Sequence, residues 1–343
     1  MDMSLINRVK LDMRSAKLYR YRLPMDSGVI LREEKLTERE GFIVELQENG
    51  KIGRGEVAPL IGFSVESLDE AGALAKEQLE LWVQGQALDY DALFPSVAFG
   101  VSMAELELAG ELPAQGQYQA APLCTGDPDE LIPQLNAMPG QKVAKVKVGL
   151  YEPIRDGMLV NLFLESMPDL YLRLDANRAW TKEKAAKFAQ YVAPSLRGRI
   201  AFLEEPCQSP SDSLSFAIDT GIAIAWDETL QHAVRSQEFR LEDLVGVKTI
   251  VIKPTLIGSV PRCLKLIEKA KALGLQTIIS SSIESSLGLT QLARLAHWQL
   301  PNEIPGLDTI GLFKAQLETP WPACELPLQT LSDQSLLWQS EPV

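Results

Sequence analysis

Charged side chains recur directly after short apolar runs in the central part of the chain. Taking one residue per run, the series in chain order is Lys147, Asp175, Glu204, Asp227 and Lys253. Neighbouring members are 28, 29, 23 and 26 residues apart, which is the length of one strand, one helix and their loops. Because the carboxyl ends of parallel barrel strands meet on one face, where enzymes of this architecture hold their chemistry, we expect these side chains to converge.

Two of the runs also indicate on which side the charges lie. Lys145 and Lys147 are separated by one valine, and Arg173 and Asp175 are separated by one leucine. Because side chains alternate between the faces of a strand, each charged pair shares one face and the apolar residue occupies the other. We therefore expect the valine and the leucine to contact surrounding helices and the charged pairs to face the barrel axis.

Converging carboxylates need a compensating positive charge, because unpaired ions inside a protein are costly. Hard oxygen ligands, with waters or substrate completing the shell, suit Mg²⁺. We therefore predict that Asp175, Glu204 and Asp227 bind Mg²⁺, for which Mn²⁺ can substitute. Glu205 and Glu228 directly follow two of these residues and should point away from the axis, in a supporting or a surface position. Solvation of a loop explains any one such charge equally well, but it does not explain five charges in register.

The elements that position these residues form a repeating pattern from residue 119 onward. Seven apolar runs alternate with helix-like segments, and a weaker eighth run lies near residues 306–307. Such alternation indicates parallel βαβ units, and continuous apolar runs are typical of strands buried on both faces. The sequence thus predicts an α/β fold with a modified (β/α)₈-type barrel, of the (β/α)₇β kind, over residues 119–310. The predicted strands are Ala120–Cys124, Val143–Val148, Leu170–Leu174, Ile200–Leu203, Ile222–Trp226, Thr249–Ile252 and Leu275–Ile279.

A second, smaller α+β domain, which would cap the barrel, is expected over residues 14–118. Asn49-Gly50 joins two strand-like runs and is a strong hairpin signal, because both residues tolerate positive φ. Ser67 and Glu70 have the spacing of a capping box at the start of a long helix. We expect the tail, residues 311–343, to pack on this domain.

The composition limits the possible partners and location. The chain has 343 residues and a net charge of −13, and an acidic surface repels nucleic acid and anionic membranes. No apolar run reaches the roughly 18 residues of a membrane span, and the N-terminus lacks the apolar core of a signal peptide. The four cysteines are widely separated and form no CxxC pair, which favours reduced thiols and a cytoplasmic location. We interpret residues 1–13 as a dispensable extension or a cloning remnant.

The charged series resembles that of a known family. A Lys-x-Lys pair, then Asp, Glu and Asp on three successive strands and a Lys on the next, is the pattern of the muconate-lactonising branch of the enolase superfamily. Within that branch, nearly the whole chain from Met13 is similar to the proteobacterial o-succinylbenzoate synthases. The similar stretches, which are specific as a set, are RLPMDSGVILRE, APLCTGDPDELI, KVAKVKVGLYEPIRDG, LRLDANRAW, FLEEPC, IAWDE, VIKPTL and SSSIESSLGLTQLAR. The segment before Met13 is the one departure, and it contains no site residue.

The resemblance implies a hydro-lyase that dehydrates 2-succinyl-6-hydroxy-2,4-cyclohexadiene-1-carboxylate to 2-succinylbenzoate in menaquinone synthesis. Lys147, in its neutral form, would remove the proton next to the substrate carboxylate and would then protonate the departing hydroxyl. Lys253, on the opposite side, would position the substrate and stabilise the intermediate as a cation against its face. The resemblance also implies a small-molecule carboxylate as substrate and a monomeric protein.

Further residues would support this chemistry or bind the substrate. Lys145 and Arg173 would favour the neutral form of Lys147 through their positive charge. Ser280 and Ser282 would bind the succinyl end of the substrate. Arg32 lies in the loop of residues 25–32, which is expected to close the site from the smaller domain. The residues expected in these roles are Lys145, Arg173, Asn177, Arg32, Ser280 and Ser282.

Two other functions are compatible with the same residues. A racemase or epimerase acting on N-acylamino acids or dipeptides would use Lys147 and Lys253 as opposed bases. The catalytic residues do not separate this function from a synthase, and only the similarity of the loops favours the synthase. The second alternative is a barrel that binds a ligand without turnover. The presence of all five catalytic-type residues argues against it.

Overall fold

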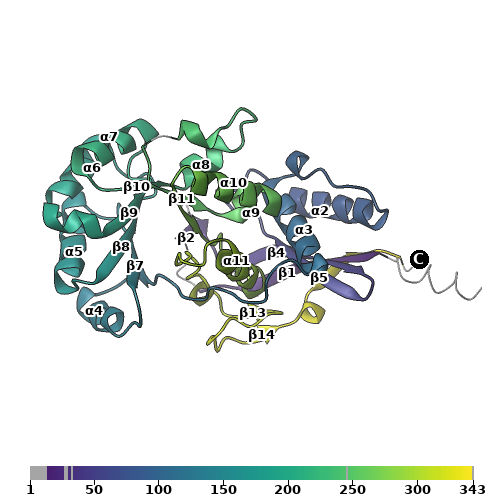
Figure 1. Cartoon of the computed structure of the whole chain (residues 1–343). Helices are drawn as coiled ribbons and strands as arrows, with labels where there is room; N and C mark the ends of the chain where they lie inside the picture. The colour runs from purple at the N-terminus through teal and green to yellow at the C-terminus, as the bar shows by residue number, and fades with distance from the viewer. Residues whose placement is uncertain (1–13, 27–29, 32–33, 245, 342–343) are drawn as a thin grey trace, which may run out of the picture.

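The computed structural model describes residues 14–26, 30–31, 34–244 and 246–341 and consists of two parts that pack against each other (Figure 1). A small antiparallel sheet with two long helices forms one part, and a curled parallel sheet with its helices forms the other. Residues 1–13 and Arg32, for which we expected an extension and a substrate contact, lie outside the described residues. Among the helices that the structure does describe, none has the length and apolar character needed to cross a membrane.

The smaller part is a four-stranded antiparallel sheet in the order β15-β1-β4-β5. Asn49 and Gly50 form the turn between β4 and β5 with φ of 53° and 75°, so the hairpin prediction is confirmed. The capping box of Ser67 and Glu70 is also present, at the start of α2. The elements of this part are β1 (Ser15–Pro24), β4 (Glu38–Glu48), β5 (Lys51–Val57), β15 (Ser335–Gln339), α2 (Leu68–Val83) and α3 (Pro95–Ala109).

The larger part is a seven-stranded sheet in the order β12-β11-β10-β9-β8-β7-β6, in which every pair of neighbours is parallel. This confirms the predicted α/β fold with a modified barrel. The strands are β6 (Leu123–Cys124), β7 (Lys142–Lys147), β8 (Leu170–Asp175), β9 (Ile200–Glu204), β10 (Ile224–Trp226), β11 (Thr249–Ile252) and β12 (Gln276–Ile279).

The barrel is closed by a segment with little strand structure. Gly306 forms a single parallel bridge with Ser280, directly after β12. Two residues later, Asp308 Oδ2 accepts a hydrogen bond of 3.1 Å from the backbone N–H of Leu123 in β6. The weak eighth apolar run therefore connects the two edge strands through a single bridge, in the place where a (β/α)₇β barrel has its eighth strand.

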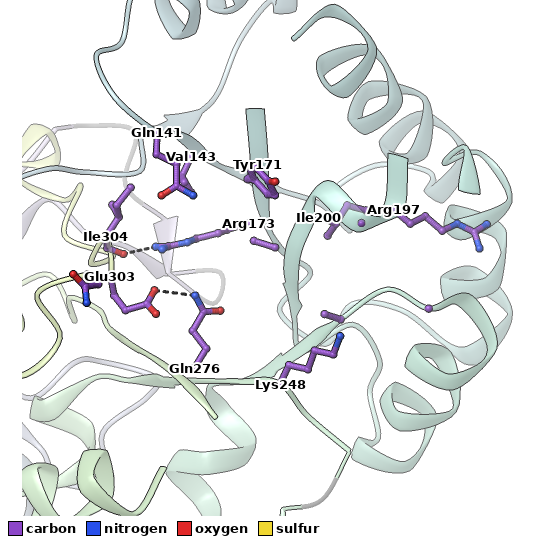
Figure 2. A pocket seen from close by; sticks show the side chains of 15 residues that line it. Gln141, Val143, Tyr171, Arg173, Arg197, Ile200, Lys248, Gln276, Glu303 and Ile304 are labelled. Carbon is purple, nitrogen blue, oxygen red and sulfur yellow. Dashed lines mark hydrogen bonds between the residues drawn. The ribbon is translucent and has the colours of Figure 1, made fainter. Parts of the chain in front are cut away.

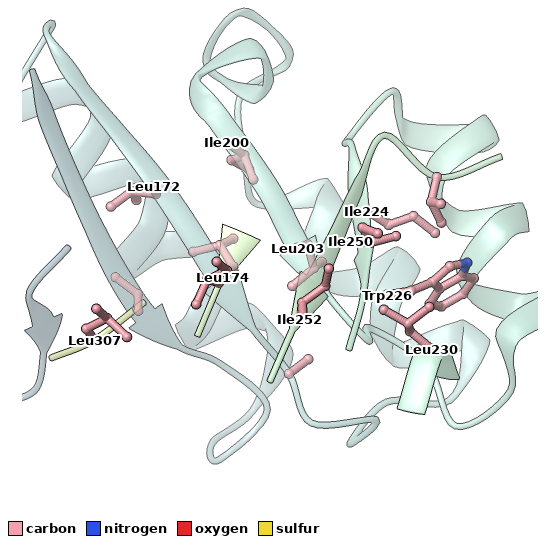
Figure 3. Close-up of a cluster of buried hydrophobic side chains, with 14 of the residues drawn as sticks. Leu172, Leu174, Ile200, Leu203, Ile224, Trp226, Leu230, Ile250, Ile252 and Leu307 are labelled. Atoms are coloured by element: carbon pink, nitrogen blue, oxygen red, sulfur yellow. The ribbon is translucent and has the colours of Figure 1, made fainter. Parts of the chain in front are cut away.

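Helices follow the strands and cover the outer face of the sheet (Figure 1). Leu172 and Leu174 of β8 belong to the same buried apolar cluster as Phe163 and Phe188 of the neighbouring helices, so the leucine predicted to face the helices does so (Figure 3). The helices are α4 (Pro128–Asn136), α5 (Pro153–Ser166), α6 (Lys182–Gln190), α7 (Pro210–Thr220), α8 (Glu228–Ala233), α9 (Pro254–Ile257), α10 (Val260–Ala272) and α11 (Ser286–Gln299).

A buried carboxylate joins the two parts of the molecule. Glu56 of β5 accepts hydrogen bonds from Tyr21 Oη at 2.6 Å, from Ser285 N and Oγ at 2.9 and 2.6 Å, and from Gly288 N at 3.0 Å. These amides are free donors at the start of α11, where a negative charge is stabilising. The smaller domain therefore fixes the helix that follows the loop after β12.

Two short strands, β2 (Ile30–Leu31) and β3 (Glu34–Lys35), form an antiparallel ladder that begins in the loop of residues 25–32, which was expected to close the site. Residues 27–29 and 32 of that loop lie outside the described residues. At its base, Met25 forms a bridge with Phe313, so the start of the loop is held by the chain after the barrel. A further two-stranded ladder in the tail pairs β13 (Gln316–Leu317) with β14 (Leu328–Gln329).

Candidate active site

Five charged residues stand at the carboxyl ends of five consecutive strands. The strand register places Lys147 opposite Asp175, and Asp175 opposite Glu204. On the next strand Ala225 pairs with Glu204, which places Asp227 just beyond the end of the ladder. The structure thus brings the predicted series together on one face of the barrel: Lys147, Asp175, Glu204, Asp227 and Lys253.

The interior of the sheet is layered in steps of two residues. Phe202, Ala225, Val251 and Ile278 pack together as a separate buried cluster inside the sheet. Two positions further along each of these strands, the side chains on the same face form the next layer, toward the carboxyl ends of the strands. These are Glu204, Asp227, Lys253 and Ser280. Ser280, which we selected only through the family resemblance, therefore belongs to the same layer as the charged residues.

Lysine ammonium groups contact all three carboxylates. Lys145 Nζ lies 3.0 Å from Asp175 Oδ2 and 3.2 Å from both carboxylate oxygens of Glu204. Lys253 Nζ lies 2.5 Å from Asp227 Oδ2. Lys147 is further away, at 3.6 Å from Asp175 Oδ2, and its side chain is 40% exposed. Lys147 is therefore the most accessible of the three lysines.

The electrostatics of the site follow from burial and close charges. Burial would raise the pKa of Asp175, but the charges of Lys145 and Lys147 outweigh it and hold that pKa well below its ordinary value. Burial raises the pKa of Glu204 to about 7, with Lys145 opposing the shift and the charges of Asp175 and Asp227 adding to it. Burial disfavours the ammonium form of Lys145, yet Asp175 and Glu204 raise its pKa, so it stays protonated.

As they stand, no three Asp, Glu, His or Cys side chains among the described residues form a group that could hold a metal ion. The reason lies in the lysines, because the ammonium groups of Lys145 and Lys253 form ion pairs with the carboxylate oxygens of all three predicted ligands. A cation bound by these carboxylates would have to displace some of these contacts.

Polar groups around the carboxylates hold them in place. The backbone N–H of Asn177, which has a φ of 45°, donates to Asp175 Oδ1 at 3.1 Å. Gln231 Nε2 donates to Asp227 Oδ1 at 2.5 Å from α8. We did not predict Gln231 from the sequence, although its i, i+4 spacing from Asp227 at the start of a helix is a usable signal. Glu205 and Glu228, for which a supporting or a surface position was open, are both buried.

The guanidinium of Arg173 lies one layer deeper in the barrel than Lys147, so it is not beside the Lys147 ammonium group as we expected. Its guanidinium donates from Nη1 to Ile304 O at 2.6 Å and lies 5.5 Å from the ring centre of Phe202. Figure 2 shows it in a cavity of about 320 Å³ whose lining residues, such as Lys248 and Gln276, stand at the opposite, amino ends of the strands. Burial lowers the pKa of Arg173, with the charges of Glu204 and Glu303 opposing the shift.

The two serines differ in their contacts. Ser280 Oγ donates to Gly306 O at 3.1 Å and thereby supports the barrel closure. Ser282 Oγ is buried and has no hydrogen-bond partner among the described residues. The intervening Ser281, which was not among our predicted residues, donates to Glu284 Oε2 at 2.7 Å. A larger cavity of about 1180 Å³ lies beside Lys147, which is part of its lining.

Two domain families match the chain. The model of the MenC N-terminal domain matches residues 13–108, and the model of the enolase C-terminal domain-like family matches residues 130–318. The chain is 75% identical over 329 residues to an o-succinylbenzoate synthase of Vibrio cholerae serotype O1 (strain M66-2). The aligned region covers 96% of this chain and 99% of that relative. An o-succinylbenzoate synthase of Aliivibrio salmonicida is 59% identical over 328 residues, covering 96% of this chain and all of the relative.

Solved structures show the same architecture. The o-succinylbenzoate synthase of Thermosynechococcus elongatus BP-1, which holds magnesium in its active site, is 25% identical with a TM-score of 0.70, covering 85% of this chain and 92% of that one. MenC from Desulfotalea psychrophila, 22% identical with a TM-score of 0.71 over 89% of this chain and 97% of that one, has the same fold. The fold and the matched domains define an enzyme of the enolase superfamily. Within that superfamily, the chain belongs to the o-succinylbenzoate synthases, which are hydro-lyases.

Proposed function

We propose that this protein dehydrates 2-succinyl-6-hydroxy-2,4-cyclohexadiene-1-carboxylate to 2-succinylbenzoate, with Mg²⁺ as its cofactor, as a step of menaquinone synthesis. The observation that supports this most directly is the cluster of three buried carboxylates and three lysines at the carboxyl ends of consecutive strands. The chain's membership of the o-succinylbenzoate synthases supplies the reaction and the pathway.

The donor set fits a hard divalent cation. Asp175, Glu204 and Asp227 offer carboxylate oxygens from adjacent strands, and all three are buried. With Lys147 neutral, as a base must be, Lys145 and Lys253 compensate two of the three carboxylate charges. A divalent cation would offset the remaining negative charge and add positive charge that the two carboxylates of the substrate can match. When bound, Mg²⁺ supplies positive charge beside the substrate carboxylate, where negative charge builds as the adjacent proton leaves. Mn²⁺, which has the same charge and prefers the same oxygen ligands, is proposed as a substitute.

Two lysines carry the proton chemistry in this proposal. Lys147 Nζ removes the proton from the ring carbon next to the carboxylate, and the electron pair of that C–H bond moves toward the carboxylate, where negative charge builds. The electron pair then returns to form the new ring double bond as the carbon–oxygen bond breaks, and the hydroxyl takes a proton from the Lys147 ammonium group and leaves as water from the same side. This syn elimination makes the ring aromatic. Lys253, which is held by Asp227, remains a cation on the opposite side.

Lys145 has a different role, because its contacts to two carboxylates raise its pKa and keep it charged. It compensates the negative charge of the site and does not transfer protons. Ser280, Ser282 and Arg32 are proposed to contact the substrate, the serines at its succinyl end. Their place in the loop after β12 and in the loop of the smaller domain supports this role.

We further propose that the protein acts as a cytoplasmic monomer on a small-molecule carboxylate and binds neither nucleic acid nor membranes. The net charge of −13 supports the two exclusions. All four cysteines are free thiols, which supports a reducing compartment.

The test is an assay of the purified protein with the cyclohexadiene substrate, in which the aromatic product is followed by its absorbance. Activity should require Mg²⁺, disappear after chelation and return when Mg²⁺ or Mn²⁺ is added. Full activity at a verified absence of metal would overturn the proposed metal site. Turnover of an N-acylamino acid or a dipeptide, with no dehydration, would favour the epimerase instead.

A further inference from the structure

Three chain segments, each adjacent to one of the proposed metal ligands, meet behind the carboxylate cluster. They are the loop after β8, the loop after β9 and the first turn of α8 after β10, and each contributes one side chain to a common contact. The three residues are Arg178, Glu205 and Thr229. None of them has a role in the proposed chemistry, yet each lies within three residues of a ligand.

Glu205 is at the centre of this contact. Its Oε1 accepts hydrogen bonds from the backbone N–H groups of Asp227 at 3.0 Å and Thr229 at 2.7 Å. Its Oε2 accepts from Thr229 Oγ1 at 2.9 Å and from Arg178 Nε at 3.3 Å. One carboxylate thus binds the loop after β8 and the N-terminus of α8, while its own backbone belongs to the loop after β9.

The backbone of Glu205 is held in an unfavourable conformation to make these contacts. Its φ is 43°, in the left-handed region that favours glycine, and its side chain is buried. Asn177 and Arg178 have φ values of 45° and 59°. Such residues persist only where surrounding contacts determine them. Here, Arg178 N donates to Glu205 O at 2.8 Å and Glu205 N donates to Ala225 O at 3.2 Å.

Arg178 completes the connection between the loops. Its Nη2 donates to Thr229 Oγ1 at 2.9 Å, and its Nε lies 3.6 Å from Glu228 Oε2. The guanidinium of Arg178 therefore compensates the charge of Glu205. It also donates a hydrogen bond to the Thr229 hydroxyl, which in turn donates to Glu205. The three side chains form a closed set of contacts with one member from each of the three segments.

We propose that Glu205 is a positioning residue that, with Arg178 and Thr229, fixes the three metal-binding carboxylates relative to one another. It acts through the backbone of Asp227 and through its own attachment to Glu204, without touching the substrate. This inference rests on the proposed metal site. Its distinguishing consequence is a loss of metal affinity, because a site whose ligands are not held in register binds the cation less tightly.

The test is the Kd for Mn²⁺, measured on the whole protein by electron paramagnetic resonance of the free ion, together with the Mg²⁺ concentration that gives half-maximal activity. Glu205→Ala should weaken Mn²⁺ binding by about 10–100-fold, as is typical for residues that orient metal ligands. Glu205→Gln keeps an acceptor oxygen for the two backbone amides but loses the charge facing Arg178. Its Mn²⁺ affinity should lie between those of the parent and Glu205→Ala.

Thr229→Val provides a milder test if Glu205→Ala does not fold. It removes the hydroxyl that joins Glu205 and Arg178 and leaves the backbone N–H in place, so Mn²⁺ binding should again weaken. The matched control is Glu66→Ala in the smaller domain. Glu66 is also a buried carboxylate that joins two segments distant in sequence, since from the chain before α2 it accepts from Ser96 N at 3.1 Å and from Ser96 Oγ at 2.5 Å at the start of α3. This control should lower the melting temperature and leave Mn²⁺ affinity unchanged.

The outcomes separate this inference from the proposed function. A parent protein that binds no Mn²⁺ overturns the metal site itself, and the inference with it. If the parent binds Mn²⁺ and a folded Glu205→Ala binds it equally well, only the positioning role is overturned. An equal loss of affinity in Glu66→Ala would also overturn it, because the effect would then come from general destabilisation.

Discussion

Lys147→Ala should abolish activity while leaving the fold intact. The substitution removes a base and an acid at once, and each role contributes roughly 10²–10⁴-fold to the rate. We expect the rate to fall by at least about 10⁴-fold, which corresponds to about 5.5 kcal/mol in the activation free energy. The side chain is 40% exposed and its nitrogen lies 3.6 Å from Asp175 Oδ2. The ion pair therefore contributes only about 0–1 kcal/mol to the free energy of unfolding.

Lys253 should respond differently, because its ammonium group is close to a buried carboxylate. The nitrogen lies 2.5 Å from Asp227 Oδ2, and the two side chains are 18% and 8% exposed. Lys253→Ala leaves Asp227 without its cation, and breaking a buried pair costs about 3–5 kcal/mol of stability. Lys253→Arg keeps the positive charge but changes its shape. Dehydration should persist in that variant with a loss of about 10²-fold, the cost of a misplacement of roughly 1 Å.

The dehydration rate of the three variants at saturating Mg²⁺ checks these expectations. Folding is measured separately by circular dichroism and urea unfolding. Comparable abolition of activity in Lys147→Ala and Lys253→Arg would contradict the one-base scheme. It would favour two opposed bases, because arginine stays protonated and cannot replace a lysine that transfers protons. Robust activity in Lys147→Ala would show that another residue is the base.

Three further predictions concern metal binding, the domain contact and the thiols. Burial and nearby carboxylates raise the pKa of Glu204 to about 7, so a proton should compete with the cation for this carboxylate. Calorimetry should show Mg²⁺ affinity falling by up to about tenfold per pH unit below pH 7. An affinity that does not change between pH 5 and pH 7 would contradict this. Glu56→Ala should lower the free energy of unfolding in urea by at least about 3 kcal/mol, and the exposed capping-box variant Glu70→Ala should lower it by much less; equal losses would refute the role of Glu56. In the native protein at pH 8 only Cys324 should react quickly with a thiol reagent, and fast labelling of a second cysteine would count against the packing. Burial raises the pKa of the other three thiols to about 11 or about 12: Cys124, Cys207 and Cys263.

The fold was predictable from the sequence because most of its elements carry strong local signals. Predicted Thr249–Ile252 agrees with β11 at both ends, and Asn49-Gly50 forms the expected turn. The first barrel strand was predicted too long, since only Leu123–Cys124 pairs with β7. The remaining residues of that run lie at the edge where the barrel closes. Pairing there depends on tertiary partners such as Asp308, which no local pattern shows.

For the site, alternation along strands predicted which residues share a face, but it did not predict the contacts between them. Arg173 shares a face with Asp175, yet its guanidinium turns toward Ile304 in the layer below. Glu205 directly follows a predicted ligand, and alternation indicated only that it points elsewhere. Its four hydrogen bonds depend on the relative placement of two loops and the N-terminus of α8, which is a tertiary property. Gln231 was missed because glutamine in a helix is usually a solvated residue.

The pairing of β15 with β1 has a consequence for how the protein is made. Residues 335–339 form an edge strand of the same sheet as residues 15–24, and the backbone N–H of Ala16 donates to Ser340 Oγ at 3.1 Å. During synthesis β1 emerges before the barrel strands and β15 emerges after them, so the edge N–H and C=O groups of β1 stay unpaired while the barrel is translated. The smaller domain cannot finish folding before then. The same proximity makes the protein suited to circular permutation, with a short linker from residue 340 to residue 15 and new ends at an exposed loop.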